Sequence, residues 1–176
     1  MTNKRHERVE AYLGRLVGYA FCLTNDRAQS RDLVQDCALK ALSARRIPED
    51  ERAYRAWIFT ILRNLFIDRL RRKQVARAPF DEEPPAESWQ VWQCNDSLIS
   101  TITVRLGMAK LTAAQREILA LVDIAGFSYA ETAAILGVPR GTVMSRLSRA
   151  RQALLLVLAD NNVRALPADA RRRNKP

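Results

Sequence analysis

Apolar residues recur at three- and four-residue steps along most of the chain, which is the spacing of one face of an α-helix. The N-terminal part has three such stripes: Val9, Leu13, Leu16, Val17, Ala20 and Phe21; then Leu33, Val34, Cys37, Ala38, Ala41 and Leu42; then Trp57, Ile58, Ile61, Leu62 and Leu65. Polar residues 24–26 interrupt the first helix. We expect a loop over 43–52, because it holds Ile47-Pro48 and several charges, and a third helix over about 54–72.

The composition changes between residues 76 and 97, where three prolines and a run of acidic residues oppose helix formation. This pattern predicts a linker between two small helical domains. We place the first domain at 1–75, the linker at 76–97, the second domain at 98–160 and a basic tail at 161–176. Trp89 and Trp92 are unexpected in a free linker; they either dock on a surface or belong to a short amphipathic turn.

The second domain carries two capping boxes, in which an N-cap hydroxyl and the side chain three residues later satisfy the first free N–H groups of a helix. Thr112 and Gln115 form one box, and Ser128 and Glu131 form the other. Apolar stripes accompany them: Leu98, Ile102, Leu106 and Ala109; then Ile118, Leu119, Leu121 and Val122; then Ala133, Ala134 and Leu136.

Gly137 follows the last of these stripes after little more than two turns of helix, and Pro139 suits the start of another helix. A short helix, a glycine-containing turn and a longer helix together form the helix-turn-helix signature. We expect the second helix to run to about Leu156. Its inward stripe comprises Val143, Leu147, Ala150 and Leu154.

The outward face of this second helix is basic, and the next acidic residue is Asp160. The side chains expected to face a DNA major groove are Arg140, Thr142, Met144, Ser145, Arg146, Ser148 and Arg149. A helical hairpin with a solvated basic face would share the spacing. The two capping boxes, the proline start and the absence of acidic side chains favour DNA binding.

The charge balance supports a polyanionic partner, since 29 basic and 19 acidic residues give a net charge of +10. Basic residues also crowd the C-terminal half of the 54–72 helix, where some of them complement the helix dipole. The aromatic residues of that helix could stack on unpaired bases or belong to the core; these are Tyr54, Trp57, Phe59 and Phe66.

Several classes of protein and site are disfavoured. The single histidine, His6, lies near the N-terminus, and Cys22, Cys37 and Cys94 form no C-x-x-C pair, so we expect neither a metal site nor another cofactor. There is no paired nucleophile and base and no glycine-rich phosphate loop, so we do not expect an enzyme. With no secretory signal and no apolar run of about 20 residues, we expect a cytoplasmic protein without membrane insertion.

Motifs in both halves resemble one family. Those in the first half are Asp32-Leu33-Val34-Gln35-Asp36 and Tyr54-Arg55-Ala56-Trp57-Ile58-Phe59-Thr60-Ile61-Leu62-Arg63-Asn64, which resemble region 2 of sigma factors. Those in the second half are Leu111-Thr112, Gln115-Arg116-Glu117, Gly126-Phe127-Ser128-Tyr129-Ala130-Glu131 and Gly137-Val138-Pro139-Arg140-Gly141-Thr142-Val143, which resemble region 4. With no domain between them, the chain resembles an extracytoplasmic-function sigma factor.

The resemblance implies a role for each motif. Asp32, Gln35 and Asp36 match positions that dock on the β′ clamp helices of core RNA polymerase. Asn64 matches a position that helps to hold an extruded base of the −10 promoter element, and we expect Arg63 beside it to contact the same DNA.

The basic-faced helix matches the part of region 4 that meets the −35 element. Met144 departs from the family pattern, which often has a basic residue there, and it offers only apolar contact to a base. Loop 43–52 also lacks the Phe-Arg-Gly-like run that the family uses to select a −10 base.

The resemblance thus implies an all-helical initiation factor that binds core polymerase and promoter DNA and is held inactive by an anti-sigma factor. Two other functions stay open. A stand-alone helix-turn-helix regulator would use only the second domain, and a sigma mimic would sequester an anti-sigma factor without touching promoters.

Overall fold

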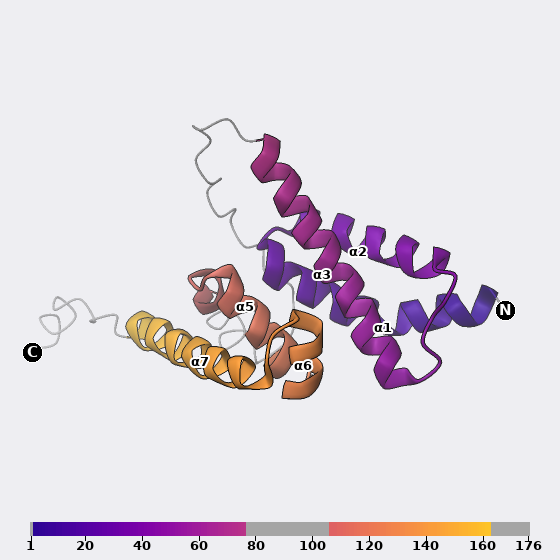
Figure 1. The fold of residues 1–176 in the computed structure, drawn as a ribbon. Helices are drawn as coiled ribbons and strands as arrows, with labels where there is room; N and C mark the ends of the chain where they lie inside the picture. The colour runs from indigo at the N-terminus through magenta and orange to yellow at the C-terminus, as the bar shows by residue number, and fades with distance from the viewer. Residues whose placement is uncertain (1, 77–105, 163–176) are drawn as a thin grey trace, which may run out of the picture.

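The computed structural model describes residues 2–76 and 106–162 and shows two bundles of helices, without strands in those ranges (Figure 1). The helices of the first bundle are α1 (Thr2–Thr24), α2 (Arg27–Ser43) and α3 (Glu51–Ala76). Those of the second are α5 (Ala113–Leu119), the π-helical turn η1 (Ala120–Ile124), α6 (Tyr129–Leu136) and α7 (Arg140–Asn162). The predicted all-α class is confirmed. Most of the predicted linker and the basic tail, with Cys94 and the two linker tryptophans, lie outside the described residues.

The first two helices meet at a tight corner. Asn25 adopts a positive φ of 53°, and Asp26 caps α2 by accepting a hydrogen bond from the Gln29 amide at 2.8 Å. Hydrogen bonds at this cap lower the pKa of the Asp26 carboxyl, because the Gln29 amide stabilises its ionised form. The polar interruption over 24–26 is therefore a turn and a cap.

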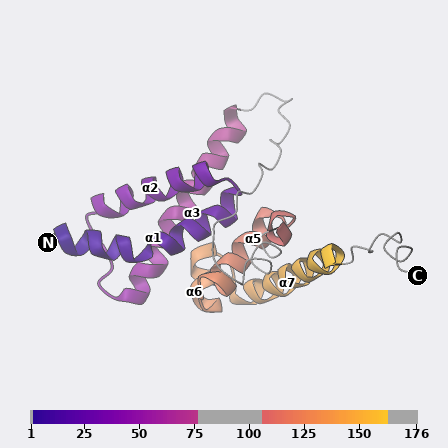
Figure 2. The ribbon, with the colours of Figure 1, turned by 180° about the vertical axis from the view of Figure 1, so that it is seen from behind.

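The buried face of α1 differs from the predicted stripe. Val17 is 41% exposed, whereas Tyr12, Tyr19 and Leu23 are buried. The stripe assumed a single partner surface, but α1 packs against α2 and α3 and also against α5 and η1 (Figures 1 and 2). A helix with partners on two sides buries a wider arc than an amphipathic stripe predicts.

The predicted loop over 43–52 is too long at both ends. Ser43 belongs to α2, and α3 begins at Glu51, three residues before the predicted start. The Asp50 carboxylate accepts a hydrogen bond from the Ala53 amide at 2.8 Å, so Asp50 acts as an N-cap that the prediction missed. The helix also continues to Ala76 rather than ending at residue 72.

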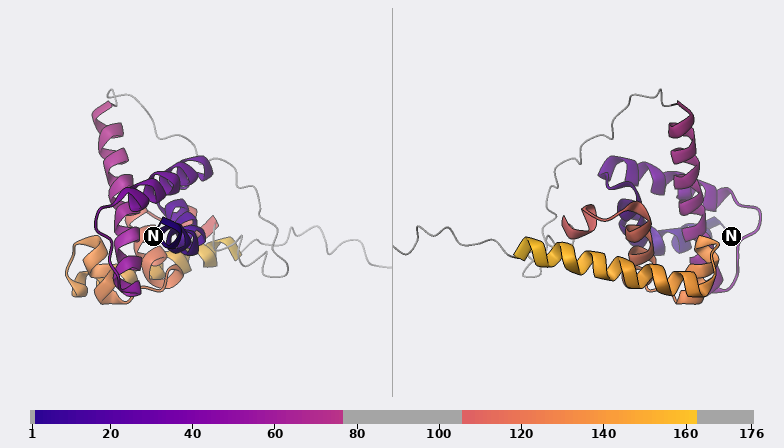
Figure 3. Two further views of the ribbon diagram at one scale, coloured as in Figure 1. Left: turned by 90° about the vertical axis from the view of Figure 1, so that its right-hand side faces the viewer. Right: turned by 60° about the vertical axis from the view of Figure 1, so that its left-hand side comes forward.

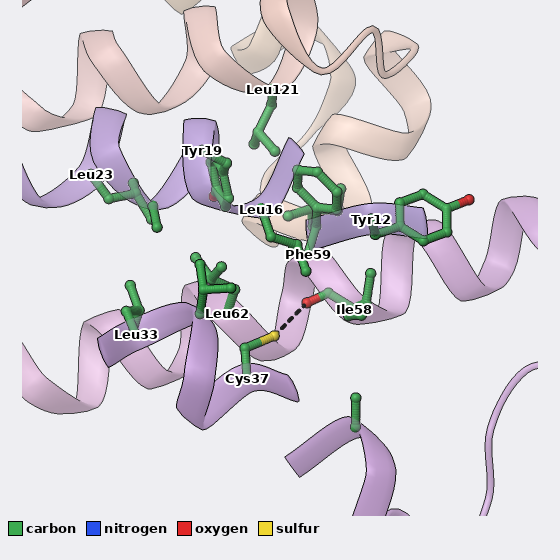
Figure 4. Packing of buried hydrophobic residues seen from close by; sticks show 14 of the residues in the cluster. Tyr12, Leu16, Tyr19, Leu23, Leu33, Cys37, Ile58, Phe59, Leu62 and Leu121 are labelled. Atoms are coloured by element: carbon green, nitrogen blue, oxygen red, sulfur yellow. Dashed lines mark hydrogen bonds between the residues drawn. The ribbon is translucent and has the colours of Figure 1, made fainter. Parts of the chain in front are cut away.

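The core of the first bundle settles the role of two aromatic residues of α3. Tyr54 and Phe59 are 2% and 0% exposed, so neither is available to stack on a base in this conformation. Trp57 and Phe66 pack against the same core and are partly buried. Cys37 is a core residue as predicted, with its thiol donating to the Ile58 carbonyl at 3.5 Å (Figure 4), and burial raises its pKa to about 12.

The second bundle confirms both capping boxes, since the Thr112 and Ser128 hydroxyls each accept from the backbone amide three residues on. Its apolar predictions need correction in two places. Leu106 is 44% exposed, and Met108 and Leu111 are buried instead. In α6, Ala134 is exposed; the residues buried in that helix are Thr132 and Ile135.

The two bundles share a core. Leu121, Phe127 and Ile135 of the second bundle belong to the buried cluster of the first, and Figure 4 shows Leu121 pointing towards the α1 and α3 side chains. The second cluster lies between α5 and α7 and includes Ile118, Leu119, Val143, Leu147 and Ala150. The bundles are therefore packed together and not merely tethered.

We predict opposite effects for two glycine-to-alanine changes. Gly137→Ala will lower the free energy of unfolding by about 1 kcal/mol, because Gly137 has a φ of 67° that alanine adopts only with strain. Gly14→Ala is the matched control: its φ is not positive and an added Cβ would meet nothing within 4 Å, so it will stabilise α1 by up to about 1 kcal/mol. Urea denaturation measures both changes, and equal effects would contradict the prediction.

Candidate nucleic-acid interface

The turn between α6 and α7 orients the basic helix. Gly137 ends α6 in the left-handed conformation, and the Val138 amide donates to the Ala133 carbonyl at 3.1 Å. Pro139 then precedes α7, with its carbonyl accepting from the Thr142 amide at 3.0 Å. Short-range hydrogen bonds and one positive φ thus fix the angle between the two helices, as a helix-turn-helix requires.

The burial of most residues of α7 agrees with its predicted inward and outward faces, with Thr142 and Leu154 as the two exceptions. Val143, Leu147 and Ala150 are buried, while Met144 is 52% exposed. Thr142 and Leu154 are partly buried. The other side chains predicted to face DNA are all exposed: Arg140, Ser145, Arg146, Ser148 and Arg149. Figure 3 shows α7 along the edge of the molecule, with its N-terminal end beside α6.

Two of these side chains bond to their own helix in this conformation. The Ser145 hydroxyl donates to the Thr142 carbonyl at 3.1 Å, and Arg149 Nε donates to the Ser145 carbonyl at 3.2 Å. These contacts hold the Arg149 guanidinium along the helix surface. A base contact from Arg149 would use its remaining N–H groups or follow a change of rotamer.

The predicted acidic surface lies on α2, where Asp32, Gln35 and Asp36 are all exposed. Asp36 is paired with Arg69 of α3 at 2.5 Å, so its charge is already partly compensated. Leu39, one turn further along α2, is 61% exposed and was not predicted as part of this surface. This face of α2 therefore combines acidic, amide and apolar groups.

The two residues predicted to meet the −10 element differ in exposure. Asn64 is exposed on α3, whereas the Arg63 side chain is 20% exposed and its Nε donates to Glu117 Oε1 at 2.8 Å. The predictions therefore fall on three surfaces, one each on α2, α3 and α7. They do not meet in one cleft.

Sequence reasoning missed Glu117, Tyr19 and Phe127 as contacts between the bundles. For Phe127 the sequence offered one signal of burial, an aromatic residue directly after a glycine. The structure shows that this glycine, Gly126, forms a turn with a φ of 71°. Glu117 had none, because a single acidic residue in a short amphipathic helix is typical of a solvated face.

Comparison with known proteins accounts for both halves. The sigma-70 region 2 model matches residues 8–75, and a sigma-70 region 4 model matches residues 103–154. The chain belongs to the sigma-70 family of RNA polymerase sigma factors, in the extracytoplasmic-function group. The region 2 match gives the first bundle a role that a stand-alone helix-turn-helix regulator would leave unexplained.

Relatives of this sigma factor cover most of its length. It is 34% identical over 160 residues to the ECF RNA polymerase sigma factor EcfG of Rhodopseudomonas palustris, covering 90% of this chain and 87% of that protein. It is also 34% identical over 148 residues to the ECF RNA polymerase sigma factor SigL of Mycobacterium tuberculosis, covering 82% of this chain and 83% of that protein.

Two solved structures share the fold of this sigma factor. The sigma factor RpoE, in complex with the anti-sigma factor NepR from Bartonella quintana, has a TM-score of 0.69 and 30% identity, covering 90% of this chain and 98% of that chain. CnrH, in complex with the cytosolic domain of CnrY, has a TM-score of 0.63 and 25% identity, covering 92% of this chain and 91% of that chain.

The described part of this sigma factor has no group of three or more His, Cys, Asp and Glu side chains placed to hold a metal ion. Among the helices described, none is long and apolar enough to span a membrane.

The second capping box lowers the pKa of its acidic residue, Glu131. The Ser128 hydroxyl and amide both donate to Glu131 Oε2, at 2.6 and 2.8 Å, and these bonds lower the pKa of the Glu131 carboxyl. The lowered pKa means that Glu131 stabilises the fold above its unfolded pKa of about 4.5, and that this contribution disappears as the pH falls through the folded value.

We therefore predict that Glu131→Gln will reduce the loss of unfolding free energy between about pH 6 and about pH 3. Glutamine keeps the capping geometry but does not titrate. Ser128→Ala is the matched variant: it removes the hydroxyl donor and should shrink the same pH dependence. Urea denaturation at each pH measures the effect, and identical pH profiles for wild type and Glu131→Gln would contradict it.

Proposed function

We propose that α7 places its N-terminal half in the major groove of the −35 promoter element. The observation that carries this proposal is the division of α7 into a buried apolar stripe and an exposed face with Arg140, Arg146 and Arg149. The first turns of a recognition helix are the part that reaches base edges. Ser145 and Ser148 offer hydrogen bonds there, and Met144 offers apolar contact to a thymine methyl.

The proposed −10 contact is made by α3. Asn64 can hydrogen-bond the edge of an extruded base, and Arg63 can contact the same strand once it leaves Glu117. Arg71, Arg72 and Lys73 are exposed further along the helix and favour a nearby phosphate backbone, whereas Arg69 is paired with Asp36.

The proposed polymerase contact is made by α2. Its exposed Asp32, Gln35 and Asp36 form an acidic surface on a chain whose net charge is +10. Such a surface complements the β′ clamp helices of core RNA polymerase, as the family resemblance implies, and electrostatic complementarity favours both correct docking and fast association.

Control by an anti-sigma factor is part of the proposal. The structural relatives RpoE and CnrH were solved with NepR and with the cytosolic domain of CnrY, and they match over 90% and 92% of this chain. The protein would then act in the cytoplasm, where polymerase and promoters are, as an initiation factor without catalysis of its own.

The decisive experiment is in-vitro transcription with purified core RNA polymerase on genomic promoter fragments, with footprints to map the two promoter elements. We expect specific transcripts that depend on this protein. Binding to core polymerase without any transcript would favour a sigma mimic, and binding to DNA without binding to polymerase would favour a stand-alone regulator.

The polymerase surface is tested by Asp32→Asn, which removes the charge while keeping the size of the side chain. We expect binding to core polymerase to be weaker by about ten- to a hundredfold, since hydrogen bonds to charged groups contribute about 1.5–3 kcal/mol. Glu10→Gln, an equal loss of charge at an exposed position of α1, is the control and should bind normally. Fluorescence anisotropy with labelled core polymerase measures both, and unchanged binding by Asp32→Asn would contradict the assignment.

Arg149→Ala tests the −35 surface. If Arg149 reads a base, we expect a loss of about 1–3 kcal/mol in −35 binding, concentrated at one base pair. Arg15→Ala is the control: it removes the same charge at an exposed position of α1 and should leave promoter selectivity intact. Transcription from a set of single-base −35 variants provides the measurement. A uniform loss across the set would assign Arg149 to a phosphate contact, and no loss would remove it from the interface.

A further inference from the structure

The shared core holds region 4 against region 2 through an apolar contact. The Phe127 ring is 3% exposed and meets Phe59 of α3 edge to face, with 4.9 Å between the ring centroids. The Arg55 guanidinium lies over the same ring at 4.1 Å, and its Nη2 donates to the Ala125 carbonyl. This contact closes the two regions on one another.

A polar contact at the same interface is centred on Glu117 of α5. Its Oε1 accepts from Arg63 Nε at 2.8 Å and from the Tyr19 hydroxyl at 3.3 Å. The Arg63 and Glu117 side chains are only 20% and 18% exposed, so the pair is screened less than a surface ion pair. The neighbouring Arg116 donates from Nε to the Cys22 carbonyl at 2.9 Å and fixes α5 beside α1.

The position of this contact has a direct consequence for DNA binding. Arg63 is a residue of region 2 whose charge we assign to the −10 strand, and in the closed structure its Nε is bonded to the Glu117 carboxylate. A phosphate or base could use the Arg63 Nε only by displacing Glu117, and Glu117 would repel a phosphate brought to the same place. The exposed face of α7, by contrast, remains free for the −35 element.

We propose that Glu117 is an autoinhibitory residue: it closes region 4 onto region 2 and withholds Arg63 from the −10 strand until binding to polymerase separates the two regions. This inference rests on the proposed contact between Arg63 and −10 DNA. The inhibition is intramolecular, so it acts in the free protein, and a partner that recognises the closed form would reinforce it.

The closed state itself is tested by small-angle X-ray scattering of the full chain. Glu117→Arg places two like charges together, so we expect a larger radius of gyration than for the wild type. The charge-swapped double variant Arg63→Glu with Glu117→Arg restores an ion pair and should return the radius towards the wild-type value. Glu10→Arg is the control for the charge change. An unchanged radius for Glu117→Arg would overturn the proposed latch.

The inhibition is tested by the affinity of the free protein for a fluorescent single strand, the non-template −10 strand of a promoter mapped in the transcription assay. We expect Glu117→Gln to bind about three- to tenfold more tightly than the wild type, since it raises the binding-competent fraction. Glu10→Gln has the same change of charge and should stay within about twofold of the wild type. Equal affinities for wild type and Glu117→Gln would overturn the inhibition.

A double-mutant cycle shows whether the effect passes through Arg63. In an Arg63→Ala background, Glu117→Gln should bring no further gain in binding; a gain that persists there would overturn the proposal. A separate measurement, open-complex formation by the holoenzyme, tests the proposed −10 role of Arg63 on which the inference rests. If Arg63→Ala holoenzyme forms open complexes as well as the wild type does, the −10 role of Arg63 is wrong, whatever scattering shows about the closed state.

Discussion

The burial of Phe127 among the helices of region 2 is the contact on which the arrangement of the two regions depends. Burying a phenylalanine side chain contributes about 1.5–3 kcal/mol. The ring therefore supplies much of the attraction, along with Leu121 and Ile135 in the same cluster. The polar contacts of Glu117 and Arg55 add to this attraction and fix how the regions are oriented.

The two proposed DNA-binding surfaces differ in how far they depend on the contact between the regions. The α7 surface depends on a turn and on a core within region 4, so it is presented whether or not region 2 is in contact. The α3 surface is shared with region 4, because Arg63 lies at the interface while Asn64 remains exposed. Under the proposed roles, the −35 surface is presented in the closed structure while the −10 surface is restricted.

The errors of prediction have a common cause. Val17 was expected inside and is exposed, and the same holds for Leu106 and Ala134. A periodic stripe shows which positions share one face of a helix but not which neighbours that face will meet. Helix α1 has partners on two sides, so tyrosines outside its stripe become core. The predicted stripes of α2 and α7 held better. In α2 and α7 the buried members are Leu33, Val34, Cys37, Ala41, Val143, Leu147 and Ala150.

The amino-acid sequence by itself determined the helices, the capping boxes at Thr112 and Ser128, the turn at Gly137 and the exposed basic face of α7. Each depends on hydrogen bonds or φ angles among residues a few positions apart, so the local sequence specifies it. Only the tertiary structure decided that Arg63 meets Glu117, 54 positions along the chain, and that Phe127 enters the core of region 2. Such contacts follow from how whole helices pack, which no local pattern encodes.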